Sequence, residues 1–409
     1  MLRLWAALRA NQTLMWACFV IAVNQLGFGI VVPVTPIYAR GFGVSEVAVG
    51  LVVAVYGLGR FLFNVPAGQA ADRFGRRPVI FVGTVVTAVG SILCGLAPDF
   101  NQLLAYRFIG GIGAAIVITG VQTVVADIAT RENRGRMMAT YQGFFIFAVG
   151  VGPGVGGTIA VLAGPRAPFF VFAALAALAG ALALWRLPET RGVALAAANA
   201  AGSAVPRGVT ARLLLTNVGF MTLSIVTFVQ FFNRTGAIFS VVPIDAVERL
   251  GLDTATIGLA LTVSSLCNIA LVGWTGSIAD RLGRKITIVP GCVIGGVSLF
   301  GFAFAPGYAM FLGSAVLWGI CGALIASSAA YAADLAPPGA TGLTMGVYRM
   351  LADLGYVVGP VLLGLIAEVA GANGSLLVAG ALSILTAIPF ALLAPETGGR
   401  RAAVPPARV

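Results

Sequence analysis

Residues 68–77 read GQAADRFGRR and residues 276–285 read GSIADRLGRK, so one ten-residue pattern occurs twice, at an offset of 208. Each copy lies between two long apolar runs, which makes it a short polar loop between two buried or membrane-spanning segments. A loop that recurs in this way predicts that the chain contains one structural unit twice.

The composition indicates a membrane protein. Of the 409 residues, 59% are hydrophobic and 10% are charged, and the mean hydropathy is +0.99. Soluble domains average about 45–50% apolar and about 25% charged residues. A soluble surface would need more charge than this chain has, whereas lipid solvates an apolar excess.

Twelve apolar runs are long enough to cross a bilayer as helices, for which about 20 residues suffice. The polar stretch between the sixth and seventh runs predicts a linker at 187–212, between six-helix bundles at 1–186 and 213–409. The basic start could belong to a cleaved signal peptide, but its apolar run continues to Pro36, so we expect a retained first span. The twelve runs are 13–36, 48–70, 78–97, 101–127, 137–163, 167–186, 213–244, 255–278, 286–305, 308–333, 342–368 and 374–394.

The basic residues predict the orientation. With the N-terminus inside, inside segments carry 18 of the 25 Lys and Arg residues, outside loops carry three and spans carry four. This asymmetry follows the positive-inside rule and predicts cytoplasmic N- and C-termini. It also accounts for the net charge of +11 without a nucleic-acid partner.

Further pairs of sequences keep nearly the same register. LPETRG from Leu187 matches APETGG from Ala394, and Asp127 matches Asp334, both at an offset of 207. NQLGFGIVVP, from Asn24, matches NRTGAIFSVVP, from Asn233, with one residue slipped. A duplicated six-helix unit is the architecture of a two-lobed transporter, whose binding site lies near the middle of the membrane between the lobes.

The two loops, the paired PET sequences and the twelve runs resemble the major facilitator superfamily over the whole chain. The resemblance implies an all-α membrane protein of twelve transmembrane helices in two pseudo-symmetric six-helix bundles, which works by alternating access. It also implies that the loops form an inner latch, in which Asp72 reaches the start of span 11 and Arg76 pairs with Asp127. The latch residues are Gly68, Asp72, Arg73, Gly75, Arg76, Arg77 and Asp127, with Gly276, Asp280, Arg281, Gly283, Arg284 and Asp334 in the second copy.

The loop residues also have a direct physical interpretation. Gly68 and Gly276 would let helices approach closely, and Gly75 and Gly283 suit a tight turn. The arginines of the loop are expected to face the cytoplasm. The alternative is that these arginines only set the topology.

Span 5 contains Gly152, Pro153, Gly156 and Gly157, which resemble the motif of antiporter branches of the superfamily. Proline removes a helical hydrogen bond and glycines admit a neighbouring helix, so a generic kink is the alternative. Arg107 in span 4 resembles an arginine of drug/proton antiporters. We expect it to point into the bundle, although snorkelling to the outer surface is open to it.

Polar side chains within the spans define a candidate substrate cavity. Tyr56, Arg60 and Asn64 recur every four residues and share one helix face. Asp353 is the only acid clearly in mid-membrane and is therefore the candidate for proton coupling, although it could instead form an intrahelical pair with Arg349. The cavity residues are Asn24, Gln25, Tyr56, Arg60, Asn64, Arg107, Asn233, Arg234 and Arg349.

Three functions remain open at this stage. The first is proton-coupled export of lipophilic or amphipathic small molecules, by a monomer in the bacterial inner membrane. The second is transport of an anionic metabolite or lipid-like anion, because Arg60, Arg234 and Arg349 outnumber Asp353. The third is a non-transporting sensor or scaffold. No enzyme activity, metal or cofactor is expected, because no catalytic triad, metal cluster or phosphate loop occurs.

Overall fold

The computed structural model describes residues 11–129, 134–192, 216–336 and 341–397, and every regular element in these ranges is a helix. The chain forms two compact units. The first consists of Met1–Gly202 with Pro243–Ser265, and the second of Ser203–Val242 with Leu266–Val409. The predicted linker 187–212 is described only to residue 192.

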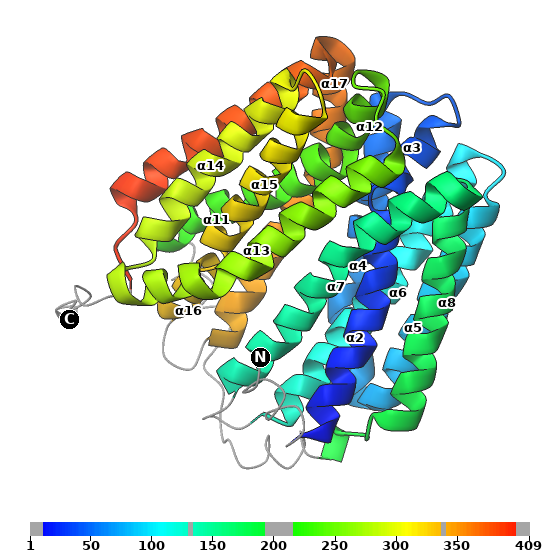
Figure 1. The fold of residues 1–409 in the computed structure, drawn as a ribbon. Helices are drawn as coiled ribbons and strands as arrows, with labels where there is room; N and C mark the ends of the chain where they lie inside the picture. The colour runs from blue at the N-terminus through cyan, green and yellow to red at the C-terminus, as the bar shows by residue number, and fades with distance from the viewer. Residues whose placement is uncertain (1–10, 130–133, 193–215, 337–340, 398–409) are drawn as a thin grey trace. The chain divides into compact units, whose positions relative to one another are not determined.

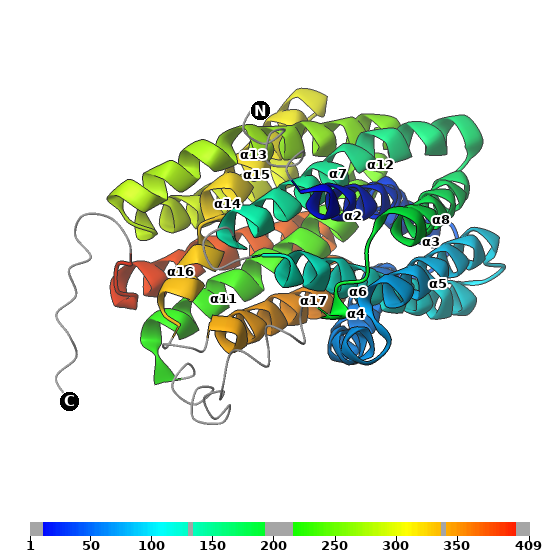
Figure 2. The same ribbon diagram turned by 90° about the horizontal axis from the view of Figure 1, so that it is seen from below.

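The first unit is a bundle of long helices. Within it, α2 packs against α7 and α8, while α5 lies beside α6 and α8 in both views (Figures 1 and 2). Its core joins aliphatic side chains of α2, α6 and α8 around the fully buried Tyr141 of α7. The helices are α2 (Gln12–Val31), α3 (Val34–Arg40), α4 (Glu46–Phe74), α5 (Arg76–Leu96), α6 (Phe100–Asp127), α7 (Arg134–Ala163) and α8 (Ala167–Arg186).

The second unit repeats this construction, with α11 and α14 packed on the long C-terminal element α17. Tyr331 and Phe390 meet edge to face at 5.3 Å in its core. The divide between the units falls inside the chain segment that contains α12 and α13. The elements are α11 (Val218–Phe232), η1 (Asn233–Val241), α12 (Val242–Glu248), α13 (Thr254–Leu282), α14 (Lys285–Phe304), α15 (Tyr308–Ile325), α16 (Ser328–Asp334) and α17 (Thr341–Leu393).

Several helices begin at a residue whose side chain accepts a backbone N–H of the first turn, which satisfies a donor that the helix itself leaves unpaired. Asn11 accepts from Leu14 at 3.0 Å, and Asp99 accepts from Gln102 at 2.9 Å. Asn217 does the same for α11, where it accepts from Phe220 at 3.0 Å.

Eleven helices of the described residues are long and apolar enough to cross a membrane. The last, Val347–Leu393, covers both of the final two predicted runs. It consists of two helices joined at Gly371, whose φ of 73° and ψ of 168° are not helical. The first predicted run is also divided, because α2 ends at Val31 and α3 begins at Val34, next to Pro33.

The seventh predicted run contains a nine-residue π-helix, η1, between α11 and α12. A π-helix accommodates an inserted residue within a continuous helix, and it is common at functional sites. This explains the one-residue slip between the stretches that begin at Asn24 and Asn233, since the second has one residue more before its proline.

Candidate functional site

Arg76 lies at the centre of the first loop. Its Nε donates to Asp127 at 2.8 Å and its Nη2 approaches Asp72 at 2.9 Å, while Nη1 donates to the carbonyl of Ala71. Thr190 Oγ1 donates to the same Asp127 oxygen at 2.7 Å. The pair of Arg76 with Asp127 that the resemblance implies is therefore present. The expectation that Arg76 faces the cytoplasm is wrong, because the residue is 3% exposed and turns inward to these acceptors.

Glu189, which follows α8 in the sequence, contacts the first loop. Its carboxylate accepts the backbone N–H groups of Arg76 at 2.9 Å and Arg77 at 3.1 Å, in the first turn of α5. A carboxylate at a helix N-terminus satisfies free donors and complements the helix dipole. Burial would raise the pKa of Glu189, but the N–H donors of Arg76, Arg191 and Arg77 and the charge of Arg76 hold it below its ordinary value. Gly75, at φ 99°, leaves room for this carboxylate, since a Cβ there would lie 2.6 Å from its oxygen.

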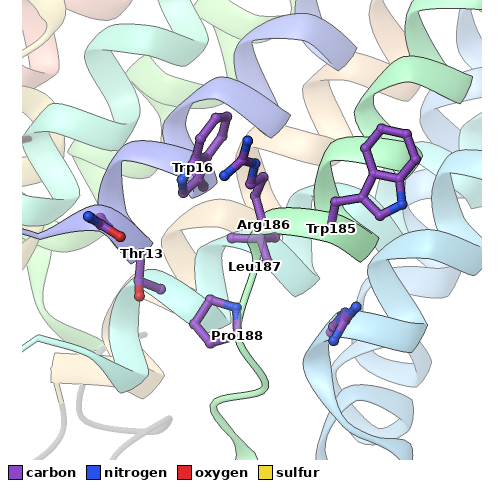
Figure 3. Close-up of a pocket in the computed structure, with 8 residues that line it drawn as sticks. Thr13, Trp16, Trp185, Arg186, Leu187 and Pro188 are labelled. Atoms are coloured by element: carbon purple, nitrogen blue, oxygen red, sulfur yellow. The ribbon is translucent and has the colours of Figure 1, made fainter.

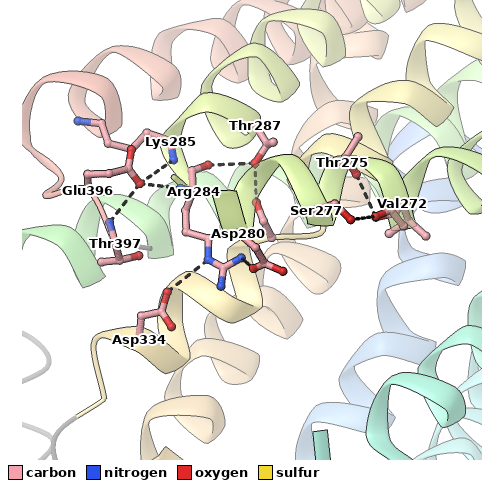
Figure 4. Close-up of polar contacts among 12 residues, drawn as sticks. Val272, Thr275, Ser277, Asp280, Arg284, Lys285, Thr287, Asp334, Glu396 and Thr397 are labelled. Carbon is pink, nitrogen blue, oxygen red and sulfur yellow. Dashed lines mark hydrogen bonds and ion pairs between the residues drawn. The ribbon is translucent and has the colours of Figure 1, made fainter. Parts of the chain in front are cut away.

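The second loop has the same arrangement (Figure 4). The N–H of Arg284 donates to Glu396 at 2.6 Å, and the Arg284 guanidinium lies between Asp280 and Asp334, 3.3 Å from the latter. Gly283, at φ 114°, precedes the new helix as Gly75 does. Two independent copies of one geometry indicate that the chain is built to hold it.

Other latch residues differ from expectation. The close approach expected at Gly68 and Gly276 is wrong within each unit. The nearest atom to a Cβ at Gly68 is Thr119 Cγ2 at 3.8 Å, and nothing in its own unit lies within 4 Å of one at Gly276. Both positions are near the C-terminal ends of long helices, α4 and α13. The residue before each glycine, Ala67 or Thr275, is the buried one, so the glycine itself lies on a different face of its helix. Arg73 and Arg281 are exposed, as is Arg77, which donates to the carbonyl of Leu184.

The glycines of α7 contact two different helices. Gly152 and Gly156 face α2, where added Cβ atoms would lie 2.5 Å from Gly29 Cα and 2.6 Å from the carbonyl carbon of Ile30. Gly157 faces the first turn of α13, where a Cβ would lie 2.9 Å from Ala255 Cα. These distances are far below the roughly 3.5–4.0 Å of normal contact between carbon atoms, so only glycine permits this packing.

Pro153 has no backbone N–H and so interrupts the helical hydrogen bonds of α7. The next residue bonds to a neighbouring helix. The N–H of Gly154 donates to Thr262 Oγ1 of α13 at 2.9 Å. The glycine motif is therefore a packing surface between α7 and two other helices, α2 and α13.

Arg107 points into the first unit. It is 5% exposed, its Cζ lies 4.5 Å from the ring centroid of Tyr56, and its Nε donates to the carbonyl of Val52 at 3.5 Å. Tyr56 in turn stacks on Phe28 of α2 at 5.2 Å. The guanidinium charge is thus stabilised by an aromatic face, and it does not snorkel to the surface.

Two asparagines at corresponding positions carry buried amide atoms with no hydrogen-bond partner in the described part of the chain. Asn24 is 1% exposed and its Nδ2 has none, while Asn233 is fully buried and its Oδ1 has none. The other amide atom of Asn233, Nδ2, donates to the carbonyl of Ala379 at 3.0 Å. Buried amide atoms normally find a partner, so these two are candidates for contact with water or a solute. Gln25, beside Asn24, is 3% exposed.

The remaining predicted cavity residues lie within the spans of their own units. Asn64 accepts a hydrogen bond from Thr119 at 3.5 Å, and Arg60 is half-buried one turn earlier on α4. Arg234 is half-buried within η1, with its Cζ 5.5 Å from the ring centroid of Phe239. On α17, Asp353 is 4% exposed and Arg349 is half-buried one turn before it.

Sequence reasoning missed the role of the PET glutamates, Glu189 and Glu396, and of Thr190. The signal was available, because both glutamates belong to sequences that repeat at the offset of 207. The repetition alone does not show that their carboxylates meet the first turns of α5 and α14. That contact joins residues more than a hundred positions apart in each unit.

Comparison with protein families places both halves in one family. A model described as Major Facilitator Superfamily matches residues 17–232 and 223–409. Multidrug resistance protein 2 of Bacillus subtilis is 26% identical over 361 residues, covering 85% of this chain and 86% of that protein.

Two further relatives match over a shorter stretch. Multidrug resistance protein 1 of Bacillus subtilis is 38% identical over 168 residues, and the quinolone resistance protein NorA of Staphylococcus aureus is 32% identical over 173. These matches span 42% and 43% of the two relatives' own lengths. Among solved structures, a D-xylose–proton symporter superimposes with a TM-score of 0.74 at 19% identity, covering 94% of this chain and 98% of that one.

Proposed function

This chain belongs to the major facilitator superfamily and is a multi-pass membrane transporter, and we propose that it exports lipophilic or amphipathic small molecules in exchange for protons. In this proposal it acts as a monomer in the bacterial inner membrane, with both termini in the cytoplasm. Its twelve spans form two six-helix bundles, 1–186 and 213–409, which alternate in their access to the two sides. The residues proposed to bind substrate include Asn24 and Asn233 with their polar neighbours.

The observation that carries the coupling proposal is the burial of Asp353. A carboxyl group within a span is costly, so such groups mark proton and ion pathways in transporters. Asp353 is 4% exposed on α17, and the chain contains no histidine that could carry the proton instead. The export direction is supported by relatives that are named for drug resistance, one of them similar over 85% of this chain.

The loops are proposed to act as a latch that favours one conformation. Each uses a buried or half-buried arginine that contacts carboxylates from two helices, Asp72 and Asp127 for Arg76, and Asp280 and Asp334 for Arg284. A set of ion pairs that must separate when helices move is a suitable bistable element. The latch therefore affects the rate of turnover rather than the affinity for substrate.

A second candidate function is transport of an organic anion. Arg234 is half-buried in η1, where its guanidinium lies over Phe239. The planar guanidinium group is well suited to a carboxylate or phosphate of a substrate. This candidate differs from the first in the charge of the solute, so one experiment can separate them.

The experiment uses the purified full-length chain in proteoliposomes with an acidic lumen. Ethidium is permanently charged, so it does not follow a pH gradient by itself, and its accumulation reports exchange for outgoing protons. The parent should accumulate ethidium only with the gradient, and Asp353→Asn should lose this uptake. Asp99→Asn is the matched control, because an asparagine side chain in place of Asp99 can still accept from the first turn of α6.

Three results would contradict the proposal in different ways. Gradient-driven uptake that persists in Asp353→Asn would exclude this residue as the proton carrier. Uptake of a radiolabelled organic carboxylate in place of ethidium would favour the second candidate. Folded protein that moves neither solute under any gradient would favour a non-transporting sensor or scaffold.

A further inference from the structure

A cavity of about 430 Å³ lies in the first unit, where α2 begins and α8 ends. Gln12, Thr13 and Trp16 line it from the first two turns of α2, and Trp185 and Arg186 line it from the last turn of α8. Arg77 contributes from the first turn of α5. Figure 3 shows Arg186 beside Trp16, with Trp185 on its other side. None of the groups assigned to substrate or proton binding takes part.

The cavity is positively charged. It is lined by Arg77 and Arg186 and by no carboxylate of the described residues. The Cζ of Arg186 lies 4.9 Å from the ring centroid of Trp16, so the indole covers one face of the guanidinium and leaves its N–H edges to donate. The carboxylate of the nearby Glu189 accepts from the backbone N–H groups of α5, which directs its charge to that helix end.

The cavity lies where one candidate span begins and another ends. The candidate span that contains α2 begins at Gln12, and the candidate span formed by α8 ends at Arg186. Trp185 is 80% exposed there, and tryptophan is enriched where a span meets the lipid headgroups. Leu178, two turns earlier on the same face of α8, is 48% exposed and continues the apolar surface toward the bilayer centre.

We propose that this cavity binds the phosphate headgroup of an anionic phospholipid from the cytoplasmic leaflet. Basic pockets between helices on the cytoplasmic side suit such headgroups. Arg186 and Arg77 contact the phosphate, Gln12 and Thr13 are positioned to donate to the headgroup, and the α8 face with Trp185 supports an acyl chain. A free phosphate ion would interact with the same arginines, but it has no acyl chain that could cover the exposed side chains of Trp185 and Leu178. The proposal does not depend on which solute the protein carries.

The test is native mass spectrometry of the purified full-length chain, with phosphatidylglycerol and phosphatidylcholine of identical acyl chains. The parent should retain phosphatidylglycerol in preference. Arg186→Gln should retain about fivefold less, the factor expected for one basic residue near a headgroup. Arg166→Gln is the matched control, because it removes an exposed arginine from the opposite end of α8 and should change nothing.

Gln12→Glu provides a second variant that does not weaken the fold. It adds a negative charge in the first turn of α2, which the helix dipole favours, but the charge repels a phosphate in the cavity. Retention of phosphatidylglycerol should fall here also, while thermal stability in detergent is kept. Equal retention by the parent, Arg186→Gln and Gln12→Glu would overturn the proposal. Displacement of the lipid by millimolar inorganic phosphate, with equal stabilisation of the protein, would overturn the lipid assignment and favour a free anion.

Discussion

Replacement of Gly156 by alanine tests the packing of α7 on α2. An added methyl group would lie 2.6 Å from the carbonyl carbon of Ile30 and 2.7 Å from its Cα. Both are backbone atoms, so the overlap is relieved only if the two helices move apart. Gly143 lies on the same helix, and nothing is within 4 Å of a Cβ built there.

The two substitutions should therefore change stability in opposite directions. Alanine in place of a mid-helix glycine gains about 0.5–1 kcal/mol from backbone entropy, which is the whole effect expected for Gly143→Ala. Gly156→Ala has the same gain, but a backbone overlap costs about 1–3 kcal/mol or more through displacement of the packed helix. We expect Gly143→Ala to raise the unfolding temperature and Gly156→Ala to lower it.

Buried thiols provide the assay. Cys18, Cys94, Cys292 and Cys321 are buried, so a thiol-reactive fluorophore reports their exposure as the purified protein is heated. The transition of Gly156→Ala should lie below that of the parent, and that of Gly143→Ala at or above it. A Gly156→Ala transition equal to the parent's would refute the argument from close helix approach. Equal losses in both variants would show that α7 requires glycine for another reason.

The other predictions concern the latch and the substrate site. Asp72→Asn should reduce the rate of flux more than substrate affinity, as measured by transport and by a binding titration, because it biases a conformation. Glu189→Gln should destabilise the protein at neutral pH: the pKa of Glu189 is lowered in the fold, so its contribution is present above the unfolded carboxyl pKa and is lost as pH falls through the folded one. Melting curves of parent and variant should therefore converge in acid, and a constant difference at all pH values would argue against a charge effect. If the substrate is an anion, Arg234→Lys should lose much of the affinity and Arg234→Ala nearly all of it, whereas unchanged binding in both would make Arg234 structural.

The sequence determined the helical segments, the internal repeat and the predicted orientation, because each depends on properties of neighbouring residues. Apolar runs, loop charges and the doubled GxxADRxGR pattern can be recognised without knowing which helix touches which. The sequence also shows that the stretch from Asn233 has one residue more than the stretch from Asn24. It does not predict that this residue is accommodated in a π-helix, since an insertion can equally be accommodated in a loop.

Only the tertiary structure decided where the side chains of the loops and spans go. From the sequence we expect Arg76 to be an exposed cytoplasmic charge. In the structure it is buried, because Asp127 and Asp72 lie within hydrogen-bond reach. Glu189 accepts hydrogen bonds from the first turn of α5 only because the fold brings the segment after α8 beside that turn. Helical periodicity shows that Gly152 and Gly156 share a face, but it does not say that the face meets α2, because the partner of a packed surface is chosen by the three-dimensional arrangement of the other helices.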